Sequence, residues 1–199
     1  MKTNIPIVEA PLGADKVLLH ACCAPCSSAV IECLLKSGIT PTIYYSNSNI
    51  VPRAEYDLRL SECVRYAAEF GIEVVEDVWN HDEWAEAVRG LENEPERGAR
   101  CLRCFSLRLR HSAEYASAHG FKVLTTTLAS SRWKRQEQTD EAGRLACEAV
   151  SLEHPESPVL WWDQNWRKGG LQERRGEIIR EMDFYNQLYC GCEYSMRHQ

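Results

Sequence analysis

Residues 16–26, Lys-Val-Leu-Leu-His-Ala-Cys-Cys-Ala-Pro-Cys, lead from a short apolar strand into a turn built of cysteines. Residues 16–20 have the pattern of a buried strand. Residues 27–36 gather their apolar side chains on one side of a helix that Gly38 ends. A nucleotide-binding α/β protein would carry glycines in this turn, so a phosphate-binding loop is not expected here. The stretch therefore predicts an α/β protein whose first turn presents thiols.

The rest of the chain continues this alternation of strands and helices. Further strands are predicted at residues 39–45, 72–76, 121–128 and 158–162, and further helices at residues 53–70, 82–89, 100–119, 136–150 and 171–185. Such alternation predicts a parallel sheet with helices on both faces and right-handed crossovers. We therefore expect a single-domain, Rossmann-like α/β fold over residues 16–199, which forms one catalytic metal-binding domain after a flexible tail at residues 1–15.

Polar residues follow three of the predicted strands. His20 ends the first strand, Asn47 and Asn49 follow the second, and residues 125–127 are three threonines near the end of the fourth. In open α/β sheets ligands bind outside the carboxyl ends of the strands. These side chains are therefore expected to share one rim.

Composition limits the class of protein. The chain has 199 residues, of which 44% are hydrophobic and 26% charged, as in an ordinary soluble globular protein. The net charge of −6 argues against a protein that coats nucleic acid non-specifically. No apolar run approaches the roughly 18 residues of a membrane span, and residues 1–14 do not resemble a secretion signal. We expect a cytoplasmic protein, in which clustered cysteines bind metal or carry out redox chemistry.

Seven of the ten cysteines lie in three short clusters. These are Cys22-Cys23-Ala24-Pro25-Cys26, Cys101-Leu102-Arg103-Cys104 and Cys190-Gly191-Cys192. A tetrahedral zinc ion or a four-iron cluster takes up to four thiolates, so six or seven thiols suit two adjacent metal centres, or one centre and a redox pair. Cys33, Cys63 and Cys147 stand singly in helical patterns and are predicted to be core residues.

Two other functions are open from the cysteines alone. A thioredoxin-like thiol oxidoreductase would use Cys23 and Cys26, at the start of a helix that follows a strand. That reading leaves the other thiols of the three clusters without a role. A zinc-binding protein that interacts with RNA would use the same clusters and would be redox-inert. Metal content separates these possibilities.

Basic residues are locally clustered despite the negative net charge. Residues 98–113 contain four arginines and no acid, and further basic pairs or triplets occur at residues 132–135 and 167–168. Judged by their charge alone, these residues are expected to lie on solvated helix faces and loops rather than to form a binding surface.

The motifs together resemble the QueH-type epoxyqueuosine reductases, which are the cobalamin-independent enzymes of tRNA queuosine biosynthesis. The resemblance extends from Val17 to Ser195. It is carried by residues 20–26 (His-Ala-Cys-Cys-Ala-Pro-Cys), 47–50 (Asn-Ser-Asn-Ile), 55–59 (Glu-Tyr-Asp-Leu-Arg), 100–105 (Arg-Cys-Leu-Arg-Cys-Phe), 125–128 (Thr-Thr-Thr-Leu), 168–170 (Lys-Gly-Gly) and 189–192 (Tyr-Cys-Gly-Cys). After Thr-Thr-Thr-Leu the family usually continues with Ser-Pro, whereas this chain has Ser130-Ser131-Arg132-Trp133-Lys134.

The resemblance implies a reductase that acts on epoxyqueuosine at the wobble position of tRNA. Two electrons and two protons open the epoxide, its oxygen leaves as water, and the cyclopentene diol of queuosine remains. The family is expected to hold a [4Fe-4S] cluster with an adjacent mononuclear iron in a fold of the adenine nucleotide α-hydrolase-like, or HUP-like, type. An external donor such as a ferredoxin or flavodoxin would supply the electrons.

The resemblance also suggests roles for individual residues. Cys101, Cys104, Cys190 and one of Cys22 and Cys23 are expected to hold the cluster. The remaining thiol of that pair would hold the second iron together with Cys192 and Cys26. The candidate proton donors are Glu55, Tyr56 and His20. The candidate contacts to the tRNA substrate are Asn47, Asn49, Arg59, Arg100, Arg103, Arg108, Trp133, Lys134, Arg167 and Lys168.

Overall fold

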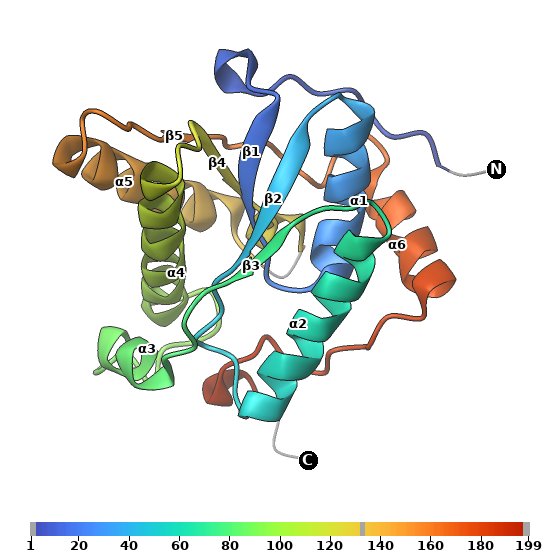
Figure 1. Ribbon diagram of the computed structural model, residues 1–199. Helices are drawn as coiled ribbons and strands as arrows, with labels where there is room; N and C mark the ends of the chain where they lie inside the picture. Colours follow the sequence, from blue (N-terminus) through green and yellow to red (C-terminus); the bar gives the residue numbers. More distant parts are fainter. Residues whose placement is uncertain (1–2, 132–133, 197–199) are drawn as a thin grey trace.

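The computed structural model describes residues 3–131 and 134–196. Its centre is a five-stranded sheet with the strand order β3-β2-β1-β4-β5, in which every pairing is parallel. The strands are β1 (Lys16–His20), β2 (Thr40–Tyr45), β3 (Val74–Glu76), β4 (Val123–Thr126) and β5 (Leu160–Trp161). The α-helices are α1 (Ala24–Lys36), α2 (Arg53–Ala68), α3 (His81–Ala87), α4 (Ala99–Ala118), α5 (Gln136–Glu153) and α6 (Leu171–Met182). The predicted α/β class is confirmed (Figure 1).

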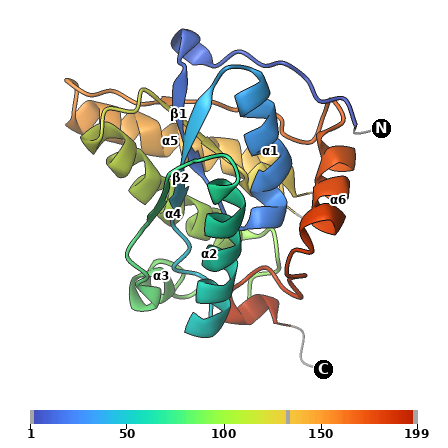
Figure 2. The same cartoon turned by 45° about the vertical axis from the view of Figure 1, so that its right-hand side comes forward.

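Helices cover both faces of the sheet, and the side chains of β1 alternate between them. Val17 and Leu19 belong to the core on the side of α1, α2 and α6, whereas Leu18 belongs to the core on the side of α4 and α5. Each of these three side chains is fully buried, and burial of a side chain of this size contributes roughly 1.5–3 kcal/mol. The helices α1 and α6 pack side by side (Figure 2).

The strand order changes direction at β1, which lies between β2 and β4. The chain adds β2 and then β3 on one side of β1, and it then returns to add β4 and β5 on the other side. A crevice forms at such a switch point, outside the carboxyl ends of the two central strands. The turn that contains Cys22 and Cys23 leaves β1 at this crevice.

Several boundaries differ from the predicted ones for local reasons. The helix α1 begins at Ala24 rather than Ser27, because Pro25 fits the first turn of a helix, where its missing N–H has no partner to lose. The strand β4 ends at Thr126, since residues 128–130 form a 3-10 turn. The helix α6 ends at Met182, three residues early, because Asp183 adopts a left-handed conformation with φ of 48°.

The described part of the N-terminal segment, for which the sequence predicts a flexible tail, packs across α1 and α6. Thr3 donates from its amide and its hydroxyl to Glu177 on α6, at 3.1 and 2.6 Å. Lys36 at the end of α1 donates to the carbonyl of Ile5 at 2.6 Å, and Ile5 is buried. These contacts join residues far apart in the sequence, so no local pattern could reveal them.

Among the described residues, no helix combines the length and the apolar character that crossing a membrane requires.

Candidate functional site

A cavity of about 350 Å³ lies at the carboxyl edge of the sheet. Its walls come from the turn after β1, the segment after β2, the helices α2, α4 and α6, and the segment that follows α6. Four cysteines line it, namely Cys22, Cys23, Cys26 and Cys190. Thiols from both ends of the chain therefore meet in one cavity.

The first three of these thiols form a compact group. The sulfur atoms of Cys22, Cys23 and Cys26 all lie within 4.8 Å of one another, and those of Cys22 and Cys23 are 3.8 Å apart. Hydrogen bonds from the other two thiols lower the pKa of Cys22 well below its usual value, against the effect of burial. Hydrogen bonds with Cys22 and Cys26, together with burial, raise the pKa of Cys23. The group therefore concentrates negative charge on one sulfur.

A second group of thiols lies beside it. Cys101 and Cys104 are in the first two turns of α4, and Cys192 packs against a small apolar cluster of Trp84, Val88 and Cys104. A smaller cavity of about 60 Å³ is lined by Cys101 and Cys192. Burial raises the pKa of Cys192 to about 11, so this thiol needs a nearby cation to ionise at neutral pH.

Cys190 connects the two groups, because it lines both cavities. All ten cysteines are free thiols. The three predicted clusters are thus brought together at the switch point of the sheet, and the singly placed Cys33, Cys63 and Cys147 are buried away from both cavities.

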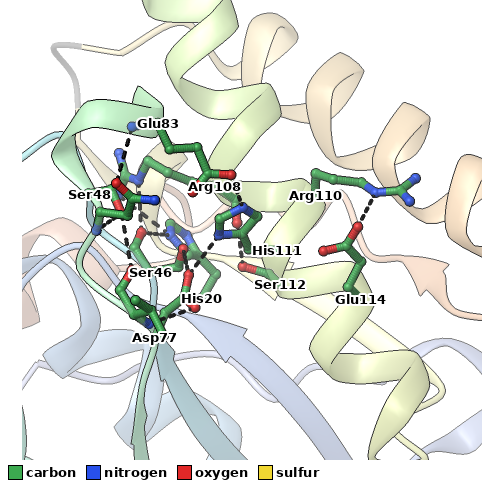
Figure 3. A network of polar contacts seen from close by, with 12 residues as sticks. His20, Ser46, Ser48, Asp77, Glu83, Arg108, Arg110, His111, Ser112 and Glu114 are labelled. Atoms are coloured by element: carbon green, nitrogen blue, oxygen red, sulfur yellow. Dashed lines mark hydrogen bonds and ion pairs between the residues drawn. The ribbon is translucent and has the colours of Figure 1, made fainter. Parts of the chain in front are cut away.

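His20 lies beside Ser46 and Arg108 in the polar network that Figure 3 shows. Its Nδ1 is 2.8 Å from the hydroxyl of Thr126, and its Nε2 is 3.1 Å from the carbonyl of Ser46. A carbonyl can only accept, so Nε2 carries the proton. Burial and the adjacent Arg108 lower the pKa of His20 to about 3, so the ring is neutral at physiological pH. This predicted proton donor joins the carboxyl ends of β1, β2 and β4.

Arg108 crosses from α4 to the same rim. Its Nε donates to the carbonyl of Ser46 at 3.0 Å, and its Nη2 donates to the side-chain oxygen of Asn47. Asn47 in turn donates to the carbonyl of Ala21 at 2.9 Å. Both predicted contact residues line the cavity, and their polar groups are used to fix the turn that presents Cys22.

A second layer of polar contacts supports Ser46 (Figure 3). Its hydroxyl donates to Asp77 at 2.6 Å, and Asp77 also accepts from Nδ1 of His111 at 2.9 Å. The other ring nitrogen of His111 lies 3.1 Å from Glu83. Two carboxylates raise the pKa of His111 to about 9, so the ring is charged at neutral pH.

The motif at residues 55–59 lies on α2 and faces the C-terminal segment. Glu55 accepts from Nε of Arg59 at 2.8 Å and from the hydroxyl of Tyr185 at 2.9 Å. Arg59 is buried and lines the cavity, whereas Tyr56 is buried among the aromatic rings of Tyr45 and Trp79 and does not line it.

The remaining predicted contacts are distributed unevenly. Lys134 lines both cavities, and negative charge at Cys190 and Cys22 raises its pKa. Asn49 lines the larger cavity, and its buried Oδ1 has no hydrogen-bond partner among the described residues. Arg100 donates to the carbonyls of residues 91, 92 and 94, so it fixes the loop before α4 while it lines the smaller cavity.

Three other candidates do not line either cavity. Arg103 on α4 and Lys168 before α6 are exposed. Arg167 donates to carbonyls at residues 129, 131 and 134 and so ties down the loop that follows β4. Trp133, also expected at the substrate, lies outside the described residues.

The lining residues that the sequence analysis did not single out include Arg175 and Tyr185. Arg175 on α6 donates from Nε to the carbonyl of Pro25 at 2.8 Å, and Tyr185 follows the same helix. Charged residues recur throughout α6, so nothing in the sequence distinguishes Arg175 from Arg180. Only the packing of α6 against α1 brings Arg175 to the cavity.

A family model described as "Epoxyqueuosine reductase QueH" matches residues 17–198. A curated protein of this name from Haemophilus influenzae is 46% identical over 198 residues, which are 98% of this chain and 78% of the relative. One from Acinetobacter baylyi is 44% identical over 190 residues, which are 96% of this chain and 84% of the relative.

A solved structure shares the fold. The U34-tRNA thiolase NcsA from Methanococcus maripaludis, solved with its [4Fe-4S] cluster, superposes with a TM-score of 0.51 at 16% identity. The match covers 92% of this chain and 62% of that chain. At this identity the likeness concerns the fold, and it agrees with the predicted Rossmann-like sheet. The family model and the matched relatives cover nearly the whole chain, including every segment that builds the site, and the chain belongs to the epoxyqueuosine reductase QueH family.

Proposed function

We propose that this chain reduces epoxyqueuosine in tRNA to queuosine and that the reduction takes place in the larger cavity. Its family is one of oxidoreductases, so the chain is an epoxyqueuosine reductase. The observation that carries the choice of cavity is the convergence of four cysteines from both ends of the chain on its walls. The thiols are suited to hold a redox metal centre, and the neighbouring cations are suited to attract an anionic substrate to the same cavity.

The donor set fits an iron–sulfur cofactor. Seven free thiols from three segments line or adjoin two neighbouring cavities. Thiolates are the ligands that iron–sulfur clusters use, and four of them satisfy one [4Fe-4S] cluster. Three thiols then remain for a second centre, which supports an adjacent mononuclear iron.

We assign the two centres by the spacing of the sulfur atoms. A tetrahedral ion with metal–sulfur bonds of about 2.3 Å has ligands about 3.8 Å apart. The 3.8 Å between the sulfurs of Cys22 and Cys23, with Cys26 close by, fits a single iron. Thiolates on different corners of a four-iron cube stand further apart. We therefore assign the cluster to the second group, whose members are Cys101, Cys104, Cys192 and the neighbouring Cys190.

This division differs from the expectation of the sequence analysis in two respects. Cys22 and Cys23 go to the same centre because their sulfurs are near neighbours. Cys192 joins the centre of Cys104 because it packs against the apolar cluster that contains Cys104 and lines the smaller cavity with Cys101. Cys190 stays with the cluster and lies where the two centres would meet.

The cofactors, when bound, supply electrons one at a time and a Lewis-acidic metal. The chain's own residues prepare the cavity for them. His20 and Arg108 fix the turn that carries Cys22, and Lys134 supplies positive charge between the two thiol groups. The balance of the reaction is two electrons and two protons for one epoxide oxygen, which leaves as water. We infer that a small external donor such as a ferredoxin or flavodoxin delivers the electrons.

The cavity also carries cations that suit an RNA substrate. Arg59, Arg108, Lys134 and Arg175 line it, against the single acid Glu96. The first two guanidinium groups are used by internal hydrogen bonds, and Lys134 faces the thiols. Among the described residues Arg175 makes no ion pair, so its charge is the one best suited to a backbone phosphate.

Metal and sulfide analysis of protein purified without oxygen tests this function first. We expect about four or five irons per chain, acid-labile sulfide and a broad visible absorbance, because four irons belong to the cluster and one to the second centre. The same preparation should then convert epoxyqueuosine in tRNA when a reduced donor is supplied. Zinc alone, or no metal after an attempted reconstitution, would contradict the assignment and favour a structural or thiol-redox protein.

A further inference from the structure

The segment from Tyr185 to Cys192 has no regular secondary structure, yet it delivers two of the proposed cluster ligands. It follows α6 and passes the start of α2, as Figure 2 shows. Its position depends on hydrogen bonds to other parts of the chain. The amide of Val51 donates to the carbonyl of Gly191 at 3.0 Å, and the hydroxyl of Tyr189 donates to the carbonyl of Val51.

Arg59 makes the most direct contact with this segment. Its Nη1 donates to the carbonyl of Cys190 at 2.9 Å, and its Nη2 donates to the carbonyl of Tyr189 at 3.1 Å. Its guanidinium also lies over the ring of Tyr189, 5.2 Å from the centroid. One side chain therefore holds two consecutive peptide groups, one of which belongs to a proposed ligand.

Glu55 orients this guanidinium. Its carboxylate accepts from Nε of Arg59 at 2.8 Å and forms an ion pair with Nη2 at 2.7 Å. The side chain of Arg59 is only 2% exposed and that of Glu55 11%. Glu55 also accepts a hydrogen bond from the hydroxyl of Tyr185, the first residue of the segment. It therefore contacts both Arg59 and the start of the segment. A buried pair of this kind keeps its geometry, because either partner alone would be an uncompensated charge.

The segment packs tightly against its neighbours at Gly191. Its φ is +140°, and a Cβ there would lie 2.9 Å from both Nδ2 of Asn49 and Cγ1 of Ile50 and 3.5 Å from Nη1 of Arg59. The peptide therefore packs directly on the loop after β2 and on the guanidinium. Cys190 and Cys192 stand on either side of this contact, so any movement of the peptide moves both thiols.

We propose that Arg59, oriented by Glu55, is a positioning residue that fixes the Cys190-Gly191-Cys192 segment so that its thiols face the metal site. The inference rests on the proposed function, because it takes these cysteines as cluster ligands. It gives the 55–59 motif a role in holding ligands, in place of proton donation by Glu55 and tRNA binding by Arg59. Groups that orient metal ligands typically affect metal affinity 10–100-fold when they are removed.

The test is the rate at which a strong iron chelator removes iron from the reconstituted protein, followed by visible absorbance. Arg59→Ala should lose iron about 10–100-fold faster than the unchanged protein. Arg59→Lys should fall between them, since one ammonium group cannot span Glu55 and two carbonyls. Glu55→Gln should accelerate the loss less than Arg59→Ala, because an amide oxygen still accepts from Nε of Arg59.

Arg53→Ala is the matched control. Arg53 lies on the same helix, is 51% exposed, and pairs with Asp57 and Glu76 rather than with the ligand segment. Its removal should leave the rate of iron loss unchanged. Gly191→Ala moves the same segment without changing Arg59 and should accelerate the loss as well. If Arg59→Ala does not fold, Arg59→Lys and Glu55→Gln test the positioning role.

The outcomes separate this inference from the proposed function. Iron in the unchanged protein together with unchanged iron loss in Glu55→Gln, Gly191→Ala and folded Arg59→Ala would overturn the positioning role and leave the reductase assignment intact. An unchanged protein that binds no iron under any condition would overturn both.

Discussion

The ring of His111 donates to the carboxylate of Asp77 across 2.9 Å and so joins α4 to the end of β3. The helix that carries Cys101 and Cys104 is thereby tied to the sheet. Asp77 also accepts a hydrogen bond from the hydroxyl of Ser46. The carbonyl of Ser46 in turn accepts hydrogen bonds from the side chains of His20 and Arg108. A mostly buried ion pair is thus connected through two further hydrogen bonds to the rim of the cavity.

The stability of the fold should depend on the charge of His111. Its pKa is about 9 in the folded chain against 6.5 for a free histidine, so the stabilisation is complete below pH 6.5 and is lost as the pH rises through about 9. After allowance for partial solvent screening the contribution is on the order of 1 kcal/mol. His111→Gln should lower the melting temperature by about 2–4 °C at pH 6. The difference should shrink towards pH 10; a constant difference across this range would contradict the account.

Removal of one proposed cluster ligand should abolish the cofactor and the activity together. Cys101→Ser replaces a thiolate with a hydroxyl, which does not ligate iron in these clusters, so visible absorbance, sulfide content and turnover should fall in parallel. Cys33→Ser is the control, because Cys33 donates to the carbonyl of Pro6 at 3.5 Å and serine can do the same. Full activity in Cys101→Ser would exclude this residue from the site.

Arg175 should contribute one phosphate contact to tRNA binding. Arg175→Ala should weaken binding and reduce the slope of log affinity against log salt by about 0.7–0.9, the value for a single released counterion. Arg180→Ala, an exposed arginine on the same helix that does not line the cavity, should leave the slope unchanged. Equal slopes for the two variants in filter-binding titrations would rule out a phosphate contact at Arg175.

The hydrogen bond between His20 and Thr126 should contribute to the stability of the fold rather than to catalysis. Thr126→Val keeps the shape of the side chain but leaves Nδ1 of His20 and the amide of Leu128 without their partner, at a cost of about 1–3 kcal/mol. The melting temperature should fall accordingly, whereas Thr40→Val at the exposed start of β2 should have little effect. Unchanged stability in Thr126→Val would show that the pair is not needed to join the strands.

The sequence was most informative where structure is local. The strand, turn and helix of residues 16–36 follow from apolar periodicity and from Gly38, and the alternation of elements gives the parallel sheet. The three cysteine clusters were recognisable because their members are neighbours in the chain. That the first of these clusters lies at the carboxyl edge followed from the general position of sites in parallel sheets, whereas the arrival of the other two there did not.

The sequence was least informative where the two ends of the chain meet. Arg59 and Cys190 are 131 positions apart, and Thr3 and Glu177 are 174 apart. Periodicity identifies buried faces, but it does not identify the partner of a buried charge. The motif at residues 55–59 therefore suggested chemistry, whereas its geometry favours support of the C-terminal ligands. The assignment of the thiols to two centres likewise depends on distances between sulfur atoms. The spacing of the cysteines along the sequence does not give these distances.

The supply of cluster thiols from α4 and from the segment after α6 also sets an order of assembly during synthesis. At about 5–20 residues per second, a ribosome makes Cys190 roughly 4–17 s after Cys104. During that interval the early thiols lack their late partners, and the loop after β2 lacks the peptide of Gly191 that packs on it. A nascent chain therefore cannot complete the cluster site, and iron–sulfur loading must follow release of the last helix and its segment. Cells that make this protein in air expose those early thiols to oxidation before the cofactor can protect them.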